Sequence, residues 1–565
     1  IENLMSIFTK VKAPKLKSSR FNLSEEHKLS CNFGEMIPIL CKEVLPSDYF
    51  EVSTELLIKL APMKAPIMHR IKAKVDYFFV PNFQVTNVFQ DFINPKVNTA
   101  SSPIVMPYVR ASNIFSAGKR PGASTLVSSL ADYLGLPVTQ SNFFTTSPTV
   151  DHQINVLPFL CYQHIYNSYF RDQNMEVLEN ASRANTTLFL IDSAKNIQGD
   201  FLSGLVALGN ATNQLSRLFE LRTSAWKKDY FTSALPSPQA GDDVELAFAG
   251  GKTPVYLDTD DMPFSDNRTQ LVKDKQGSDY TSPGSLLHTN SAKLQSVGTG
   301  GIQADAFLDP NNTMFVDVPG GSITINNLRR LFALQRFREL AERGGTRYPE
   351  LVQNFFHAFL PDWYFDRPIY LGGQVQPIQV GEVVQTVSDQ NNPLAYRGGQ
   401  ANSYGRTRTV HFKSPCHGFL MGILRILPEA TYQQGLERMW SRSSIYDYAF
   451  PQFANLGEQE IFGKEIFANG DAGDDTVFGY TPRYAEYKTG HTHVSGKFRT
   501  DLDYWHLGRV FSNRPQLNKQ FIMMDSMDYD PFYITDSSTE HCYVDLYNNI
   551  LARRPLPYFG TPGSI

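Results

Sequence analysis

Cysteine is scarce in this chain of 565 residues. The chain has five cysteines, and none of them forms a C-x-x-C pair. An odd number of cysteines in a long chain differs from the paired framework of small secreted proteins. We therefore expect reduced thiols in a cytosolic compartment. The cysteines are Cys31, Cys41, Cys161, Cys416 and Cys542.

Long apolar runs are also missing. The longest strongly apolar stretch, GFLMGILRILP, is interrupted by Arg425, whereas a membrane-spanning helix needs about 20 consecutive apolar residues. The first residues contain no apolar core of the kind found in signal peptides. We expect no membrane insertion.

Positive charge is not in excess, because the formal net charge is −4. The chain as a whole is therefore not attracted to DNA or to an anionic membrane, and any contact with nucleic acid must be local. Hydrophobic residues make up 42% of the chain, which is enough for a large core. The aromatic share of 13% favours β-sheets and large protein interfaces over helical bundles.

The motifs of common enzyme classes are incomplete. In GGKT at 250–253, Leu246 stands where a phosphate-binding loop requires its first glycine. In GTGGIQ, Gln303 stands where a dinucleotide fingerprint requires its last glycine. His491 and His493 would share one face of a strand, but no further metal ligand stands at a recognised spacing. We expect no catalytic residue, no metal site and no cofactor.

Acidic residues gather in two places. The first group could ligate Ca²⁺, but it lacks the glycine and the distant glutamate of a calcium loop, so an exposed acidic loop is the better interpretation. The second group contains paired carboxylates of the kind that glycosidases use, so the interpretation as a glycosidase stays open in principle. The groups are Asp258, Asp260 and Asp261, and Asp525, Asp528 and Asp530.

Periodicity predicts strands near both ends of the chain. In RIKAKVDYFF, apolar residues from Ile71 to Phe79 alternate with Lys72, Lys74 and Asp76. Strands are also expected at 35–46, 51–62, 417–428, 484–500 and 503–511. Helices are expected at 124–135, 157–174 and 324–345. Together these elements predict a mainly β, Greek-key sandwich with enlarged loops.

Composition divides the chain into four parts. Residues 1–22 form a basic N-terminal arm, and residues 23–240 carry the first strands and helical insertions. Residues 241–321 are rich in Gly, Asp, Ser, Thr, Asn and Pro and form a long surface insertion. Residues 322–565 carry a further helix and the remaining strands.

The basic arm is a candidate DNA contact, because several cations on an extended segment can neutralise phosphates without reading sequence. A tail that only keeps the chain soluble is an equally good interpretation. The arm's cations are Lys10, Lys12, Lys15, Lys17 and Arg20.

Aromatic residues precede a Pro-Ser-Pro break in LRTSAWKKDYFTSALPSPQ, residues 221–239. We expect Trp226, Tyr230 and Phe231 to be buried or interfacial anchors at the entry to the insertion. Ordinary core packing within one subunit is the alternative.

Long blocks of the sequence resemble the major capsid proteins of the Microviridae, and in particular those of gokushoviruses. They include FNLSEEHKLSCNFGEMIPILCKEVLP and TYQQGLERMWSRSSIYDYAFPQFANLGEQ. The blocks follow in order along most of the chain, at 21–82, 157–174, 221–239, 325–352, 367–373, 431–459, 478–490 and 495–511.

This resemblance implies an eight-stranded antiparallel jelly roll of the viral capsid type. It implies a T=1 icosahedral virion capsid that encloses a circular single-stranded DNA genome and is assembled in the bacterial cytoplasm. The expected partners are other copies of the chain, the genome, a small basic DNA-binding phage protein, pilot and scaffolding proteins, and a bacterial surface receptor contacted through the insertion. A jelly-roll carbohydrate-binding protein is the alternative.

Overall fold

The computed structural model describes residues 18–94, 103–140, 142–176, 191–207, 211–239, 241, 325–343, 353–355, 361, 367–384, 386, 397–525, 527–536 and 538–559, with short strands between 256 and 315. The chain divides into two compact units. Unit 1 comprises Ile1–Ala240 with Glu339–Ile565, and unit 2 comprises Gly241–Arg338. Unit 2 begins where the composition changes, and it ends inside a helix.

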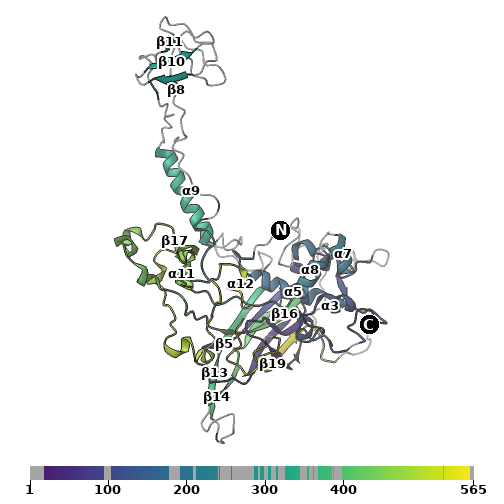
Figure 1. Cartoon of the computed structure of the whole chain (residues 1–565). Coiled ribbons are helices and arrows are strands. Elements are labelled where there is room, and N and C mark those ends of the chain that lie inside the picture. The colour runs from purple at the N-terminus through teal and green to yellow at the C-terminus, as the bar shows by residue number, and fades with distance from the viewer. Residues whose placement is uncertain are drawn as a thin grey trace. The chain divides into compact units, whose positions relative to one another are not determined.

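Unit 1 is built on a 10-stranded sheet with the order β1-β19-β4-β14-β13-β5-β16-β3, in which β15 also pairs with β4 and β2 with β19. Figure 1 labels β5, β13, β14, β16 and β19 of this sheet. The strands are β1 (Ser19–Asn22), β2 (Glu25–Cys31), β3 (Ile37–Val44), β4 (Tyr49–Leu60), β5 (Ile71–Pro81), β13 (Ile369–Val384), β14 (Arg397–Arg406), β15 (Val410–Lys413), β16 (Gly418–Pro428) and β19 (Cys542–Arg554).

The ten strands occupy eight positions. Strands β1 and β2 pair with different parts of β19, and β14 and β15 pair with different parts of β4. Strand β13 pairs with β5 through residues 369–378 and with β14 through residues 379–384, so it belongs to both halves of the curled sheet. All these ladders are antiparallel. The predicted eight-stranded jelly roll is confirmed.

The main core lies between the two halves of the sheet. It takes Ile71, Val75 and Phe79 from β5, and matching apolar residues from β3, β4, β16 and β19. The alternation in RIKAKVDYFF therefore marks one buried face, as predicted, and Lys72, Lys74 and Asp76 lie on the other.

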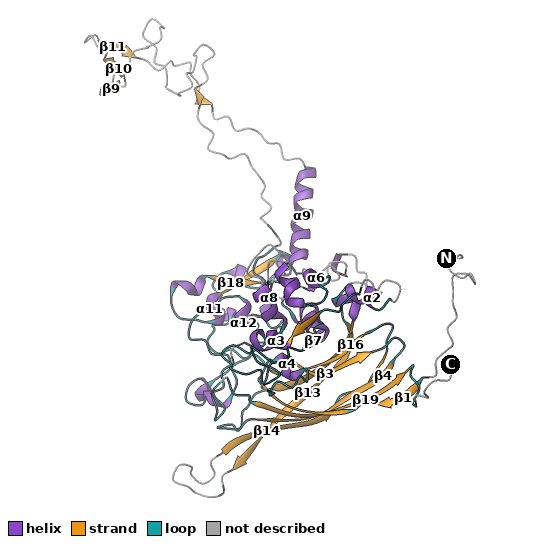
Figure 2. Ribbon diagram, turned by 90° about the vertical axis from the view of Figure 1, so that its right-hand side faces the viewer, coloured by secondary structure: helices purple, strands orange, loops and turns teal. Residues whose placement is uncertain are grey.

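Helices cover the outer face of the half made by β3, β16 and β5, as Figure 2 shows for α3, α4 and α8 above the strands. Phe78 and Met421 point into this second core with Phe159 and Tyr162 of α5. The helical elements are α1 (Asn82–Val85), α2 (Val88–Phe92), α3 (Ala111–Ala117), α4 (Leu130–Tyr133), α5 (Leu157–Ile165), the π-helix η2 (Tyr166–Phe170), α6 (Ile191–Ala194), α7 (Phe201–Ala207) and α8 (Ala211–Leu218), beside the strand pair β6 (Tyr108–Arg110) and β7 (Gln153–Asn155).

A third apolar cluster packs the chain that follows β16 against Tyr230 and Phe231. Its elements are η4 (Arg438–Ser441), η5 (Ile445–Asp447), η6 (Pro451–Phe453), β17 (Glu458–Phe462), α11 (Gly463–Ile466), η7 (Ala472–Asp475), β18 (Val477–Pro482), η8 (Ala485–Tyr487), η9 (Gly496–Arg499), η10 (Asp503–Trp505) and α12 (Lys519–Ile522).

Two local predictions were wrong. The strands expected at 484–500 and 503–511 are short 3-10 turns, because this stretch joins no sheet. The helix expected at 124–135 is reduced to α4, because Ser128 adopts a φ of 61° that no α-helix continues through.

Unit 2 contains a three-stranded sheet of β9 (Leu286–Thr289), β10 (Lys293–Val297) and β11 (Gln303–Ala306), and a pair formed by β8 (Tyr256–Leu257) and β12 (Met314–Phe315). Helix α9 (Ile325–Arg343) spans the boundary between the units and matches the helix predicted at 324–345. None of the helices in the described ranges is long and apolar enough to cross a membrane.

Candidate subunit interface

The predicted anchors Trp226, Tyr230 and Phe231 are all buried within unit 1. The backbone N–H of Trp226 donates to the carbonyl of Ile522, and the Arg509 guanidinium lies 4.9 Å from the centre of the Trp226 ring. Tyr230 and Phe231 meet edge to face in the third cluster. These rings hold the loop region together from inside, and their role at a subunit contact stays a prediction.

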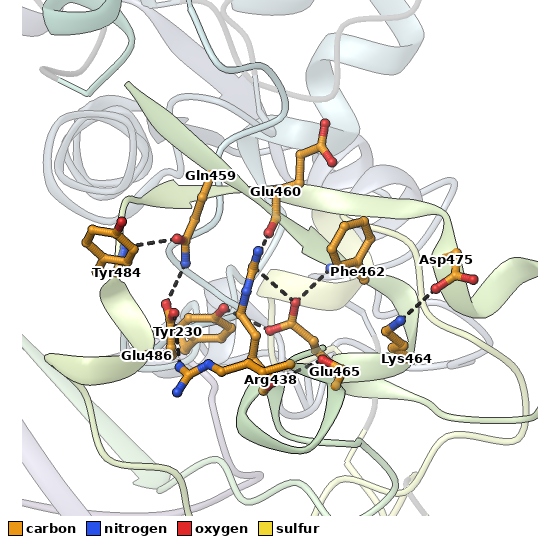
Figure 3. A network of polar contacts seen from close by, with 12 residues as sticks. Tyr230, Arg438, Gln459, Glu460, Phe462, Lys464, Glu465, Asp475, Tyr484 and Glu486 are labelled. Carbon is orange, nitrogen blue, oxygen red and sulfur yellow. Dashed lines mark hydrogen bonds and ion pairs between the residues drawn. The ribbon is translucent and has the colours of Figure 1, made fainter. Parts of the chain in front are cut away.

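Glu465 is the centre of a buried polar network beside these rings (Figure 3). The Tyr230 hydroxyl donates to Glu465 Oε2 at 2.8 Å, and the backbone N–H of Phe462 donates to Oε1 at 3.0 Å. Arg438 lies 3.5 Å from Oε1 and donates to the Glu460 carbonyl at 2.6 Å. Burial raises the pKa of the Glu465 carboxyl, although these donors oppose the shift.

A second buried carboxylate, Glu486, continues the network. It accepts from the Gln459 side chain at 2.6 Å and lies 3.4 Å from the Arg442 guanidinium. The side-chain oxygen Oε1 of Gln459 accepts a hydrogen bond from the backbone N–H of Tyr484, and the Tyr484 hydroxyl accepts one from the backbone N–H of Phe450. Arg438 and Arg442 thus fasten the chain after β16 to β17 and η8 by charged hydrogen bonds with little access to water.

The segment 436–456, which carries Arg438 and Arg442, also has a run of exposed apolar side chains, which we name the apolar strip. Exposures of its members range from 36% for Phe450 to 71% for Trp440. Exposed apolar side chains that gather in one segment mark interaction surfaces, and aromatic residues and Met are enriched at protein interfaces. The strip comprises Leu436, Met439, Trp440, Ile445, Tyr446, Tyr448, Phe450 and Leu456.

Sequence reasoning did not single out the strip as a surface. The segment has no apolar period, because its short 3-10 turns repeat neither every 2 nor every 3.6 residues. The high density of aromatic residues in this segment was the signal from which the strip could have been predicted.

The other sequence candidates are spread over the molecule. Arg20 lies on β1, 3.8 Å from Glu51, so the last part of the expected arm belongs to the sheet. Lys10, Lys12, Lys15 and Lys17, and Asp258, Asp260 and Asp261 of the insertion, lie outside the described residues.

His491 and His493 have different neighbours. His491 packs on Tyr230, and Nδ1 of His493 lies 3.1 Å from Glu437. Across the described part of the chain, no group of three or more potential metal ligands was found. Asp525 accepts from Thr223, and Asp530 pairs with Lys64 at 2.8 Å, so these acids are engaged separately.

Comparison with known families decides the class of this protein. The family described as "Capsid protein (F protein)" matches residues 9–564. The chain belongs to this capsid protein family. Capsid protein VP1 of Chlamydia phage 1 is 31% identical over 612 residues, covering 98% of this chain and 97% of the relative. VP1 of Bdellovibrio phage phiMH2K is 30% identical, with 99% and 97% covered, and VP1 of Spiroplasma virus 4 is 27% identical, with 98% and 97% covered.

Membership confirms the resemblance to the Microviridae and gives the protein its class. The F protein family consists of viral structural proteins, so this chain is a component of a virion capsid and not an enzyme. A capsid is a homo-oligomeric shell, so part of the surface of the chain must contact other copies.

Proposed function

We propose that copies of this chain assemble into a T=1 icosahedral shell around a circular single-stranded DNA genome, with the apolar strip as one contact between subunits. The observation that carries the proposal is the pairing of exposed and buried features in the chain after β16. Eight large apolar side chains of this segment are exposed, while Arg438 and Arg442 of the same segment pair with Glu465 and Glu486.

A rigid apolar surface suits repeated association, because little conformational entropy is lost when a neighbour covers it. Heterologous contacts of this kind close into rings around symmetry axes. Trp440 and Tyr446 are the strongest candidates for anchors, since large aromatic side chains dominate the energetics of interfaces.

The remaining contacts follow from the family resemblance. The arm residues Lys10, Lys12, Lys15, Lys17 and Arg20 contact the genome, and a small basic phage protein neutralises much of the rest. Pilot and scaffolding proteins join assembly in the bacterial cytoplasm. The insertion at 241–321, with Asp258, Asp260 and Asp261, contacts a receptor on the bacterial surface.

Assembly tests this proposal. We expect the double variant Trp440→Ser, Tyr446→Ser to remain soluble but to form few or no shells when expressed beside the neighbouring phage genes. Sedimentation and negative-stain microscopy measure the outcome. Tyr533→Ser is the matched control, because Tyr533 is a similarly exposed aromatic residue outside the strip.

Normal shells from the double variant would remove the strip from the proposed interface. A small oligomer that persists for the wild-type chain, with and without the neighbouring genes, would contradict shell formation altogether. A glycan-binding screen would then test the carbohydrate-binding alternative.

A further inference from the structure

Two cations face each other across strands β5 and β16. The register places Lys74 directly opposite Arg425, on the face of the sheet that points away from the main core. Like charges directly opposite each other in an antiparallel pair destabilise the sheet. This arrangement therefore needs a compensating negative charge.

Only part of that charge is supplied by the chain. Arg425 donates to Asp76 at 2.5 Å and to the Ser224 hydroxyl at 3.2 Å, and Lys72 pairs with Glu429. No hydrogen bond or ion pair is recorded for the Lys74 ammonium group among the described residues. Burial, with Arg425 as the next cause, lowers the pKa of Lys74.

Two more cations lie near this pair. The backbone N–H of Glu429 donates to the Arg70 carbonyl at 3.0 Å. The charge of Lys227 lowers the pKa of both Lys74 and Glu429. We name Arg70, Lys72, Lys74, Lys227 and Arg425 the β5 cation cluster. Its carboxylate partners among the described residues are Asp76 and Glu429, so the cluster keeps an excess of positive charge. Arg425 lies 4.3 Å from the ring of Phe170, the last residue of η2, so the cluster borders the end of the helical layer.

We propose that the β5 cation cluster binds phosphate groups of the packaged single-stranded DNA, which places this rim of the helical layer on the genome side of the shell. The inference rests on the proposed function, since it requires an enclosed genome. Lys72 and Lys74 lie two residues apart on one face of β5, and Arg70 directly precedes the strand, so the three cations form a single track along the chain. Such a track suits a repeating phosphate backbone.

The composition of the cluster favours nucleic acid over a protein neighbour. Lysine is depleted at protein interfaces, whereas lysine and arginine contacts to phosphate supply most non-specific DNA binding. Tyr370 lies beside the cluster, 45% exposed, and its hydroxyl donates to Asp76 Oδ1 at 3.1 Å. An exposed aromatic ring beside cations gives an unpaired base a surface for stacking.

Salt-dependent DNA binding tests the proposal directly. The variant Lys74→Gln, Lys227→Gln removes two cluster cations that have no recorded ion pair. The control Lys59→Gln, Lys413→Gln removes the same charge from two exposed lysines on the uncovered face of the other half of the sheet. Fluorescence anisotropy with labelled oligothymidylate is measured on the unassembled full chain between about 50 and 200 mM salt.

We expect the cluster variant to bind more weakly, with the slope of log affinity against log salt reduced by about 1.4, or roughly 0.7 for each lost phosphate contact. The control should keep the wild-type slope. The melting temperature of the cluster variant should not fall, because Lys74→Gln relieves repulsion with Arg425. The proposal would be overturned if both variants lost the same amount of affinity for oligothymidylate, or if neither lost any.

Assembly distinguishes the remaining outcomes. If the cluster variant binds DNA normally but forms no shells, the cluster receives acidic side chains of a second copy, and the DNA inference is wrong. If shells form normally and DNA binding is unchanged, the inference fails while the proposed function stands. If the wild-type chain forms no shells but shows the expected loss of DNA binding, the proposed function fails instead.

Discussion

Strands β16 and β19 line the same core, but their second faces meet different surroundings. Strand β16 reads GFLMGILRILP and is buried on both faces, since α5 and its neighbours cover the outer one. Strand β19 reads CYVDLYNNILARR, and its outward residues Tyr543 and Tyr547 are each about two-fifths exposed. A continuous apolar run thus marks a strand between two layers, and alternation marks a strand with one solvated face.

The largest expected difference between these strands concerns truncation of an outward side chain. Met421 of β16 is fully buried in the second core, so Met421→Ala should lower the free energy of unfolding by about 2–5 kcal/mol. Tyr547→Ala on β19 should cost less than about 1 kcal/mol. Urea unfolding of the unassembled chain measures both, and equal costs would show that the helices do not form a true second core.

A smaller effect is expected where the two halves of the sheet meet through polar groups. The Tyr77 hydroxyl of β5 lies 2.6 Å from Thr54 Oγ1 of β4, which donates to Asn548 Oδ1 of β19 at 2.7 Å. Because these groups are buried, Tyr77→Phe leaves partners unsatisfied and should cost about 1–3 kcal/mol. Tyr404→Phe, at an exposed tyrosine of β14, should change the free energy of unfolding by less than about 0.5 kcal/mol. If Tyr77→Phe costs as little free energy of unfolding as Tyr404→Phe, the two halves are joined by apolar packing alone.

The smallest effect should appear at the turn that joins the two halves. Asp48 is buried between β3 and β4, accepts the N–H of Leu45 at 2.9 Å and lies 3.3 Å from Arg554. Burial raises the pKa of this carboxyl, against the opposing effects of Leu45 and Arg554. The folded chain therefore holds the Asp48 proton more tightly than the unfolded chain does.

This stabilisation is complete at a pH below the ordinary carboxyl pKa and is lost as the pH rises through the raised value. Asp48→Asn should remove that contribution and flatten the dependence of the melting temperature on pH between about 3 and 7. Asp91→Asn, at an exposed position of α2, is the control. If Asp48→Asn leaves the dependence of the melting temperature on pH unchanged, the Asp48 carboxyl does not titrate within this range.

Periodicity predicted the elements whose surroundings are regular. The alternation of β5, the apolar run of β16 and the long helix α9 could all be predicted from the sequence. In each of them the pattern of side chains continues unchanged over many residues. The stretch 484–511 is rich in Tyr, Phe and Trp, which favour strands, but no neighbouring strand among the described residues pairs with it. Strand propensity describes a fit to an existing sheet, and here that sheet is missing.

The candidate surfaces were harder to predict. Trp226, Tyr230 and Phe231 stood out by composition, but the choice between interior and interface needed the fold. The Lys74–Arg425 pair depends on the register between two distant strands, and Arg425 and Asp76 are 349 residues apart. A one-dimensional pattern carries no information on such a register, because strand pairing is set by the whole sheet.

The pairing of β4 with β19 also means that β4 is translated long before the strand it pairs with. Thr54 and Asn548, which bond across this ladder, are separated by 494 residues. At a ribosomal rate of about 5–20 residues per second, β4 emerges roughly 25–100 seconds before its partner exists. During that interval a newly made strand has an open edge and its neighbour is still being translated. An open strand edge can pair with another chain, so premature pairing between nascent chains is the hazard that this topology must survive.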